Sequence, residues 1–299
     1  MHIPDGFLST PVWAALDVAA APAAAYMARR AQQGFYDQRV PLLGVMGAFV
    51  FAAQMINFPV GAGTSGHLVG SALLAVTLGP AAAGVVMTAI LAIQALVFQD
   101  GGILALGANV WNMAVAGVLA GYLPYHVWGA GRWRKLALFL GGTLSVLVAA
   151  LLAIAELRLS GIPMPPPVLG VSFGLFAVSA LLEGAITLAV VQALETLHPG
   201  SVRQPAPGRT GALAIAALAL AVVGVLFAST APDGLERLAE NLGIASRAQA
   251  LVPTPFADYE AGFLQSEWLK KASAGLVGLG LIFGACLLVA RAVSHRRSA

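Results

Sequence analysis

Long apolar runs separated by short polar stretches form the dominant pattern of this chain. The runs are rich in Ala, Leu, Val and Gly, and several reach the roughly 20 residues that a helix needs to cross a membrane. A β-barrel would instead show shorter segments in which apolar and polar residues alternate. We therefore predict an all-α polytopic membrane protein with nine spans, at residues 11–29, 41–58, 67–79, 81–98, 105–125, 135–156, 168–195, 211–229 and 272–290.

Two of these spans carry additional information. The third, 67–79, is the shortest and begins with polar residues, so we expect a broken or partly re-entrant helix. On the second span, small residues recur every four positions at Gly44, Ala48 and Ala52. Such a stripe allows close helix contact in a membrane. It indicates either docking of another subunit or internal packing within the block formed by the first seven spans.

Composition supports a membrane location. Of the 299 residues, 59% are hydrophobic and 10% are charged, and the mean hydropathy is +0.85. A soluble domain typically carries about 25% charged residues. The formal net charge of +3 does not indicate binding to nucleic acid, because the basic residues lie at the ends of the predicted spans. We therefore expect the chain to be surrounded by membrane lipid.

The distribution of Lys and Arg predicts the orientation, because cytoplasmic loops are enriched in both. With the N-terminus outside, eleven of the 16 basic residues lie on the inner side, and only Arg158, Arg237, Arg247, Lys270 and Lys271 lie outside. We therefore expect a multi-pass protein of the bacterial cytoplasmic (inner) membrane, with the C-terminus in the cytoplasm. The inner residues are Arg29, Arg30, Arg39, Arg132, Arg134, Lys135, Arg203, Arg209, Arg291, Arg296 and Arg297.

The chain divides into two parts. Residues 1–195 form a block of seven spans with short loops, and the Pro- and Gly-rich stretch 196–210 is typical of a linker, here on the cytoplasmic side. Residues 211–299 contain two spans on either side of an outer segment, 230–271. That outer segment contains six acidic and four basic residues but no histidine or cysteine, so we do not expect the main metal site there.

The first two residues, Met1 and His2, can form a chelate. The terminal amine, the backbone amide nitrogen of His2 and its imidazole close a five-membered and a six-membered ring on one cation once the amide proton is lost. Three nitrogens in one plane suit square-planar Ni(II) or Cu(II), and also low-spin Co(II). The alternative is a frayed terminus without a ligand role. The chelate requires a free amine on a retained Met1, which the bulky second residue favours.

His67 is the third candidate ligand, in the stretch NFPVGAGTSGHLVG at residues 57–70. The small residues from Gly61 to Gly66 allow the backbone to turn tightly and to approach a ligand closely. The alternative is a buried histidine with a structural role. In the predicted topology this segment lies on the same side as Met1 and His2. His67 can then supply the fourth nitrogen of a plane, which suits a d8 ion.

Several polar residues are candidates for holding these ligands in place. Asp5 follows Pro4 in a predicted turn and either bonds back to the terminal segment or only shapes the turn. Asn57, Thr64 and Ser65 flank His67 and are expected to hold its second ring nitrogen or the loop, as outer-shell groups of metal sites do. Asn109 lies near the outer end of the fifth span, where it lines the same cavity or serves as an interfacial anchor.

Glu183 lies in the middle of the seventh predicted span, where a charge is costly and usually functional. It is a buried structural carboxyl, a proton carrier or a contact with another subunit. The chain contains no G-x-x-x-x-G-K-[ST] and therefore no Walker-type ATP site. The H-E-x-x-H motif is also absent, so we predict neither an enzyme nor a bound cofactor.

Three motifs in order, MHIPDGFLS at the start, GTSGHLVG around His67 and DGGILALGANVWNM at 100–113, carry a family resemblance. Residues 1 to about 195 resemble the metal-binding substrate component of energy-coupling factor transporters for nickel and cobalt, the CbiM/NikM family. APDGLE at 231–236 resembles the small companion component that is named for its PDGLE motif. The two components are fused here.

The resemblance implies a seven-helix subunit in which Met1, His2 and His67 bind the metal. It also implies a transmembrane coupling subunit and cytoplasmic ATPases as partners. We therefore predict the substrate-binding subunit of an ATP-driven Ni(II) importer, since the fusion to the companion favours nickel. The alternatives are the same role for Co(II), a self-sufficient secondary transporter or channel, and a membrane metal sensor or assembly factor.

Overall fold

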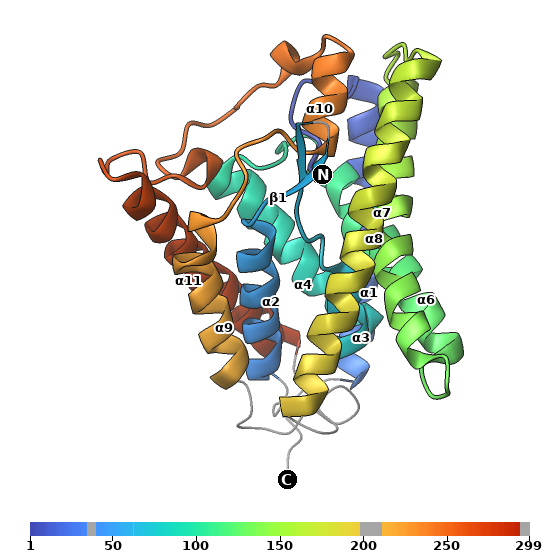
Figure 1. Cartoon of the computed structure of the whole chain (residues 1–299), viewed down its shortest axis with the longest axis vertical. Coiled ribbons are helices and arrows are strands. Elements are labelled where there is room, and N and C mark those ends of the chain that lie inside the picture. Colours follow the sequence, from blue (N-terminus) through green and yellow to red (C-terminus); the bar gives the residue numbers. More distant parts are fainter. Residues whose placement is uncertain (35–39, 62, 198–210, 294–299) are drawn as a thin grey trace.

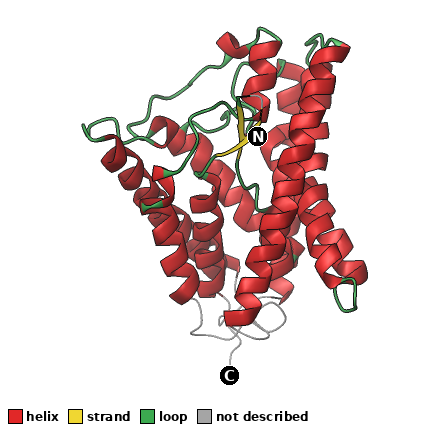
Figure 2. Ribbon diagram, viewed as in Figure 1, coloured by secondary structure: helices red, strands yellow, loops and turns green. Residues whose placement is uncertain are grey.

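A computed structural model describes residues 1–34, 40–61, 63–197 and 211–293. These residues form a bundle of helices, with loops and one small two-stranded sheet gathered near Met1 (Figures 1 and 2). Five helices of the described part are long and apolar enough to cross a membrane: Pro80–Phe98, Leu106–Trp128, Arg134–Leu159, Pro166–Thr196 and Glu267–Val289. The prediction of an all-α polytopic membrane protein is therefore confirmed.

Each predicted span coincides with one helix or with consecutive helical segments. The first seven correspond to α1 (Thr10–Gly34), α2 (Val40–Gln54), α3 (Ser71–Leu78), α4 with the π-helical turn η2 (Pro80–Ile93 and Gln94–Phe98), α5 with η3 and α6 (Leu106–Asn109, Val110–Gly117 and Val118–Trp128), α7 (Arg134–Leu159) and α8 (Pro166–Leu197). The last two are α9 (Gly211–Val222) and α11 (Glu267–Val293). The short helices η4 (Gly224–Leu226), α10 (Gly234–Asn241), η5 (Ala245–Arg247) and η6 (Ala257–Tyr259) lie between them.

The region around the third span is irregular, as its polar start predicts. An antiparallel hairpin, β1 (Phe58–Gly61) and β2 (Thr64–Gly66), precedes α3, which begins only at Ser71. Gly70 sits between them at φ 79°, a left-handed conformation that favours glycine. At about 1.5 Å per residue, the 8 residues of α3 are far too few to cross a bilayer. His67 therefore lies in non-helical backbone inside the bundle.

The stripe of small residues on α2 packs inside the chain. Ala48 and Ala52 are buried, and a Cβ on Gly44 would collide with the ring of Phe283 on α11. Helix α2 packs against both α9 and α11 (Figure 1). Neither interpretation of the stripe anticipated this partner, because α2 packs against the last two spans of the same chain and not only within the first seven.

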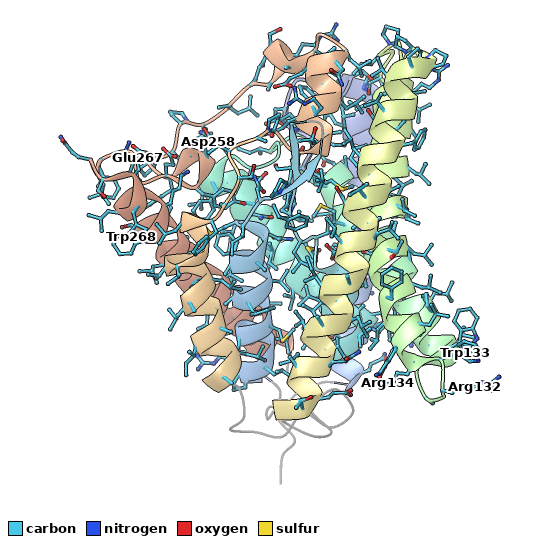
Figure 3. All side chains as sticks on the ribbon, in the orientation of Figure 1. Arg132, Trp133, Arg134, Asp258, Glu267 and Trp268 are labelled. Carbon is cyan, nitrogen blue, oxygen red and sulfur yellow. The ribbon has the colours of Figure 1, made fainter. Side chains whose placement is uncertain are left out.

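The predicted outer and inner sides correspond to opposite ends of the bundle. Arg132 and Arg134 lie at the end that is remote from the N-terminus, whereas Asp258 and Glu267 lie toward the end that holds it (Figures 1 and 3). Segment 230–271 crosses that second end, with α10 above the hairpin and the N-terminus (Figure 1). Most of the predicted linker, residues 198–210, lies outside the described residues.

Candidate metal centre

The N-terminal arm is fixed inside the bundle by Asn109. The Asn109 side-chain oxygen accepts the N–H of Ile3 at 2.8 Å, and its amide group donates to the Ile3 carbonyl at 3.0 Å. The Ile3 carbonyl also accepts the N–H of Gly102 at 2.8 Å. Ile3 is fully buried. Asn109 therefore anchors the arm that carries Met1 and His2.

Asp5 organises the loop between η2 and α5. Its carboxylate accepts the N–H groups of Ile103, Leu104 and Ala105 at 2.9, 2.8 and 3.1 Å. A turn does follow Asp5 at Gly6, whose φ is 91°, but neither interpretation from the sequence predicted a bond from Asp5 to a distant loop. The Asp5 carboxylate joins the N-terminal arm to a loop about 100 residues further along the chain. It does so because the backbone N–H groups of that loop, just before the first turn of α5, have no partner within the helix.

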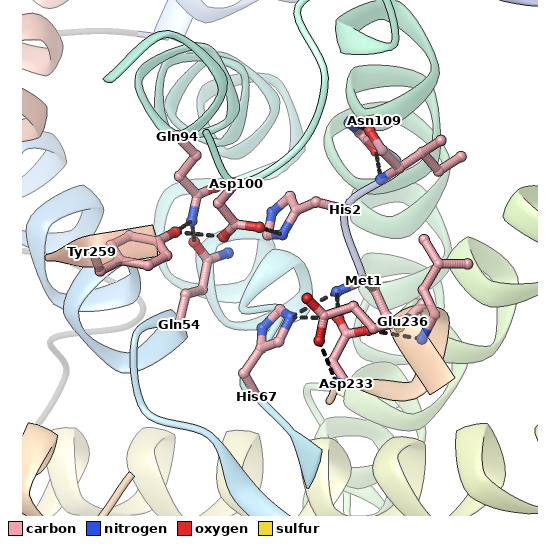
Figure 4. Close-up of polar contacts among 12 residues, drawn as sticks. Met1, His2, Gln54, His67, Gln94, Asp100, Asn109, Asp233, Glu236 and Tyr259 are labelled. Atoms are coloured by element: carbon pink, nitrogen blue, oxygen red, sulfur yellow. Dashed lines mark hydrogen bonds and ion pairs between the residues drawn. The ribbon is translucent and has the colours of Figure 1, made fainter. Parts of the chain in front are cut away.

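The terminal amine of Met1 and His67 meet at the centre of the site. The amine nitrogen lies 2.7 Å from Nε2 of His67 (Figure 4). The other ring nitrogen, Nδ1, lies 3.0 Å from the Leu68 carbonyl. Because a carbonyl only accepts, Nδ1 carries the proton, and the lone pair of Nε2 faces the amine. Two of the three predicted ligand residues are therefore in direct contact.

His2 lies beside this pair but faces a different partner. Its Nδ1 is 2.9 Å from Oδ1 of Asp100, and its buried Nε2 has no hydrogen-bond partner among the described residues (Figure 4). The rings of His2 and His67 are nearly parallel, with an angle of 4° and centroids 5.6 Å apart. Nδ1 is the nitrogen that the predicted six-membered ring requires. A cation that binds it must therefore replace the contact with Asp100.

Asp233, from the APDGLE motif, contacts the amine directly, and sequence reasoning missed this role. Its Oδ2 lies 2.5 Å from the Met1 nitrogen and 3.7 Å from Nε2 of His67. Its Oδ1 accepts the N–H groups of Leu235 and Glu236, and the Glu236 side chain accepts the N–H of Asp233 in return. This capping box begins α10 and leaves one carboxylate oxygen for the amine. The spacing of Asp233 and Glu236 signals the capping box in the sequence, but it does not indicate the contact with Met1.

Tyr259 provides a second contact from the same C-terminal part. Its hydroxyl donates to Oδ2 of Asp100 at 2.5 Å and accepts from the Gln94 amide at 2.9 Å (Figure 4). Asp100 therefore bridges Tyr259 and His2. Asp258 and Tyr259 both have positive φ values, 53° and 58°. Non-glycine residues in this region are strained and persist only where the surrounding structure imposes it.

The residues that flank His67 hold the C-terminal part and do not contact the ring. Ser65 donates from Oγ to the Ala231 carbonyl at 2.7 Å, and its N–H donates to the Pro232 carbonyl at 2.8 Å. The Asn57 carbonyl accepts the N–H of Ser229 at 2.7 Å, and the Thr64 hydroxyl accepts from Arg237 at 3.4 Å. Of the two roles expected for these residues, they hold the loop, whereas the second nitrogen of His67 contacts the adjacent Leu68 carbonyl.

The carboxylates make the site electronegative. Burial raises the pKa of Asp233, but the charge of the adjacent terminal amine outweighs it, so this pKa lies well below its ordinary value. Burial likewise raises the pKa of Asp100, and interaction with His2 more than compensates, so that it too lies below its ordinary value. Two ionised carboxylates thus flank the ligand nitrogens. Negative charge at such a position attracts divalent cations.

Side chains alone do not provide a metal cluster. In the described parts of the chain, no group of three or more His, Cys, Asp and Glu side chains has an arrangement that can hold a metal ion. A metal centre at Met1 therefore depends on the terminal amine and on main-chain nitrogen in addition to the two imidazoles.

Comparison with known proteins matches both parts of the chain. Residues 2–201 match the family model described as the cobalt uptake substrate-specific transmembrane region (CbiM), and residues 209–295 match the PDGLE domain. A fused nickel transport protein NikMN of Rhodobacter capsulatus is 32% identical, with 99% of both chains covered. A chain of Archaeoglobus fulgidus, which carries the provisional name of fused nickel transport protein NikMN, is 36% identical over 94% of this chain and 95% of its own.

Solved structures agree with these matches. A crystal structure described as a truncated transition metal transporter is 36% identical and superposes with a TM-score of 0.59, covering 66% of this chain and all of the other. The fold and the family matches together define a multi-pass membrane component of nickel or cobalt transport rather than an enzyme. The chain belongs to the CbiM family of cobalt uptake transmembrane components, here fused to a PDGLE domain.

Proposed function

We propose that this chain is the substrate-binding subunit of an ATP-driven energy-coupling factor importer, and that it captures Ni(II) with Met1, His2 and His67. The observation that carries the proposal is the 2.7 Å separation between the Met1 nitrogen and Nε2 of His67. Nitrogen ligands lie about 2.0 Å from a divalent metal. Two of them at a right angle are then about 2.8 Å apart, close to the separation found here.

The proposed donor set consists of four nitrogens. They are the Met1 amine, the backbone nitrogen and Nδ1 of His2, and Nε2 of His67. The amine must be free and unprotonated, the amide of His2 must lose its proton, and Nδ1 must exchange Asp100 for the cation. Metal capture therefore releases protons. Four nitrogens in a plane favour the d8 ion Ni(II), and the same donors also accept Co(II), which is the alternative substrate.

We propose that the seven-span part, 1–195, supplies all the ligands and that the companion part, 211–299, helps to load them. Asp233 on the amine and Tyr259 on Asp100 support this role, because both come from segment 230–271. The contacts of Ser65 and Asn57 hold the same segment against the metal-binding loop. This segment and the N-terminus lie outside the cell in the proposed orientation, in which the chain spans the cytoplasmic membrane with its C-terminus inside.

ATP hydrolysis is assigned to partner chains, because this sequence contains no Walker motif. The proposed partners are a transmembrane coupling subunit and cytoplasmic ATPases. Uptake of labelled nickel into liposomes that contain the full set of subunits should require ATP. Equal uptake by the purified chain alone, without ATP, would instead establish a self-sufficient transporter.

The ligand assignment is tested by comparing His67→Ala with His126→Ala. His67 contributes one of the four proposed nitrogens, whereas His126 lies exposed on α6 beside Tyr122. We expect His67→Ala to lower nickel affinity by at least the roughly 10–100-fold that loss of an outer-shell partner causes. The measurements are chelator competition and the visible spectrum of the purified chain, with the mass of the intact N-terminus to establish a free Met1. A larger effect of His126→Ala would place the site elsewhere.

A further inference from the structure

Glu183 on α8 binds the backbone directly after His67. Its Oε2 accepts the N–H of Val69 at 2.8 Å, and its Oε1 accepts the N–H of Gly70 at 2.8 Å. The two N–H groups lie between β2 and α3, where neither a strand nor a helix supplies an acceptor. Glu183 is fully buried within the chain, which leaves no surface for contact with a second subunit.

The carboxylate reaches the ring of His67 through a single peptide group. The N–H of Val69 and the carbonyl of Leu68 belong to the same planar unit, so an acceptor that holds the first also orients the second. The Leu68 carbonyl accepts the hydrogen bond that Nδ1 of His67 donates. That bond determines which ring nitrogen keeps its lone pair, and Nε2 is the one that faces the Met1 amine.

Other contacts of the same segment show that it is held on more than one side. The Gln54 amide donates to the Val69 carbonyl at 2.8 Å, and the Gln54 side-chain oxygen accepts from Gln94 at 2.9 Å. Gly70 adopts φ 79°, and a Cβ there would collide with the side chain of Val50. The segment is therefore tied to α8 by Glu183 and to α2 by Gln54.

We propose that Glu183 is a positioning residue for metal binding, which aims Nε2 of His67 through the Leu68–Val69 peptide. This inference rests on the proposed role of His67 as a ligand. Orienting partners of metal-ligating histidines fix the tautomer and the direction of the ring, and their loss costs about 10–100-fold in affinity. Here the partner is a main-chain carbonyl, and Glu183 fixes that carbonyl from a different helix. The geometry of the site therefore depends on the position of α8.

The test compares Glu183→Gln with Glu156→Gln. Glutamine keeps one acceptor oxygen, but its NH2 group faces the second backbone N–H, so one buried donor loses its partner. Glu156 provides a matched control, because it is also buried, on the neighbouring helix α7, and bonds only to the Asn112 side chain in the described structure. We expect Glu183→Gln to weaken nickel binding about 10-fold or more and to shift the visible band of the bound metal. Glu156→Gln should change neither.

A double mutant separates positioning from general stability. If Glu183 acts through His67, Glu183→Gln should cause no further loss of nickel affinity in a His67→Ala background, since coupled residues are not additive. Additive losses, or native affinity and spectrum in the single variant, would overturn the inference. Native affinity in His67→Ala itself would overturn the proposed function instead.

A second variant covers the case in which Glu183→Gln does not fold. Gln54→Leu removes the contact with the Val69 carbonyl on the other side of the segment. We expect a smaller loss of nickel affinity in the same direction, which again disappears in the His67→Ala background. An unchanged affinity in Gln54→Leu would then overturn the inference.

Discussion

The anchoring of the N-terminal arm by Asn109 allows a quantitative prediction. Asn109→Ala removes two buried hydrogen bonds to Ile3, at 2.8 and 3.0 Å. The Ile3 carbonyl keeps the N–H of Gly102, whereas its own N–H loses the acceptor that Asn109 supplies. An orphaned buried donor costs about 1–3 kcal/mol, and the second bond adds about 0.5–1.5 kcal/mol.

The arm should therefore be destabilised in its docked position by about 1.5–4.5 kcal/mol. Since about 1.4 kcal/mol corresponds to a factor of ten, we expect nickel affinity to fall by at least about 10-fold. The measurement is chelator competition on the purified full chain, together with its melting temperature. Met1 and His2 keep all their donor atoms in this variant, so any loss reports on anchoring alone.

Asn57→Ala is the matched control for this prediction. Asn57 lies directly before β1, and the contact found for it, with Ser229, uses the main-chain oxygen that alanine retains. Nickel affinity of this variant should stay within about threefold of native, below the roughly tenfold that 1.4 kcal/mol represents. Native affinity in Asn109→Ala, or an equal loss in both variants, would refute the anchoring argument.

Three further predictions concern the companion part and the proton balance. Ser65→Ala removes the bond to Ala231, so proteolysis of segment 230–271 should become faster; Ser71→Ala, which loses a bond to Met113 inside the seven-span part, should not have this effect. A chain truncated after residue 197 should fold and bind nickel but take up labelled nickel more slowly with its partners, and normal uptake would show that the companion is dispensable. Nickel affinity should rise from pH 6 to pH 8, because the bound nitrogens must be unprotonated; a flat profile would contradict a deprotonated donor set.

The helical part of the fold was predictable from the sequence because each span is encoded locally. A run of apolar residues of sufficient length satisfies its own backbone in a membrane only as a helix. The nine predicted ranges therefore coincide with helical segments, and the short third range was recognised by its polar start. The hairpin before α3 was not predicted, because glycine-rich stretches permit many backbone conformations.

The candidate ligands were also predictable from local chemistry. An amine, an amide and an imidazole within two residues form a chelate in any fold, and His67 follows a glycine-rich turn. The roles of Asn57, Thr64 and Ser65 were left open between the ring nitrogen and the loop for the complementary reason. Their residue types suit many hydrogen bonds, and only packing shows which acceptor lies within reach.

Sequence by itself thus determined the class of protein, the helical spans and the three candidate ligands, since each depends on residues that are adjacent or regularly spaced. Tertiary structure alone decided that Asp233 contacts the Met1 amine, 232 positions away, and that Glu183 holds the backbone beside His67. Glu183 is a buried carboxylate and Asp233 a half-buried one, and these partners come from distant segments. An acidic residue in an apolar stretch of sequence indicates that its charge needs a partner, but only the packed bundle determines which donors provide it.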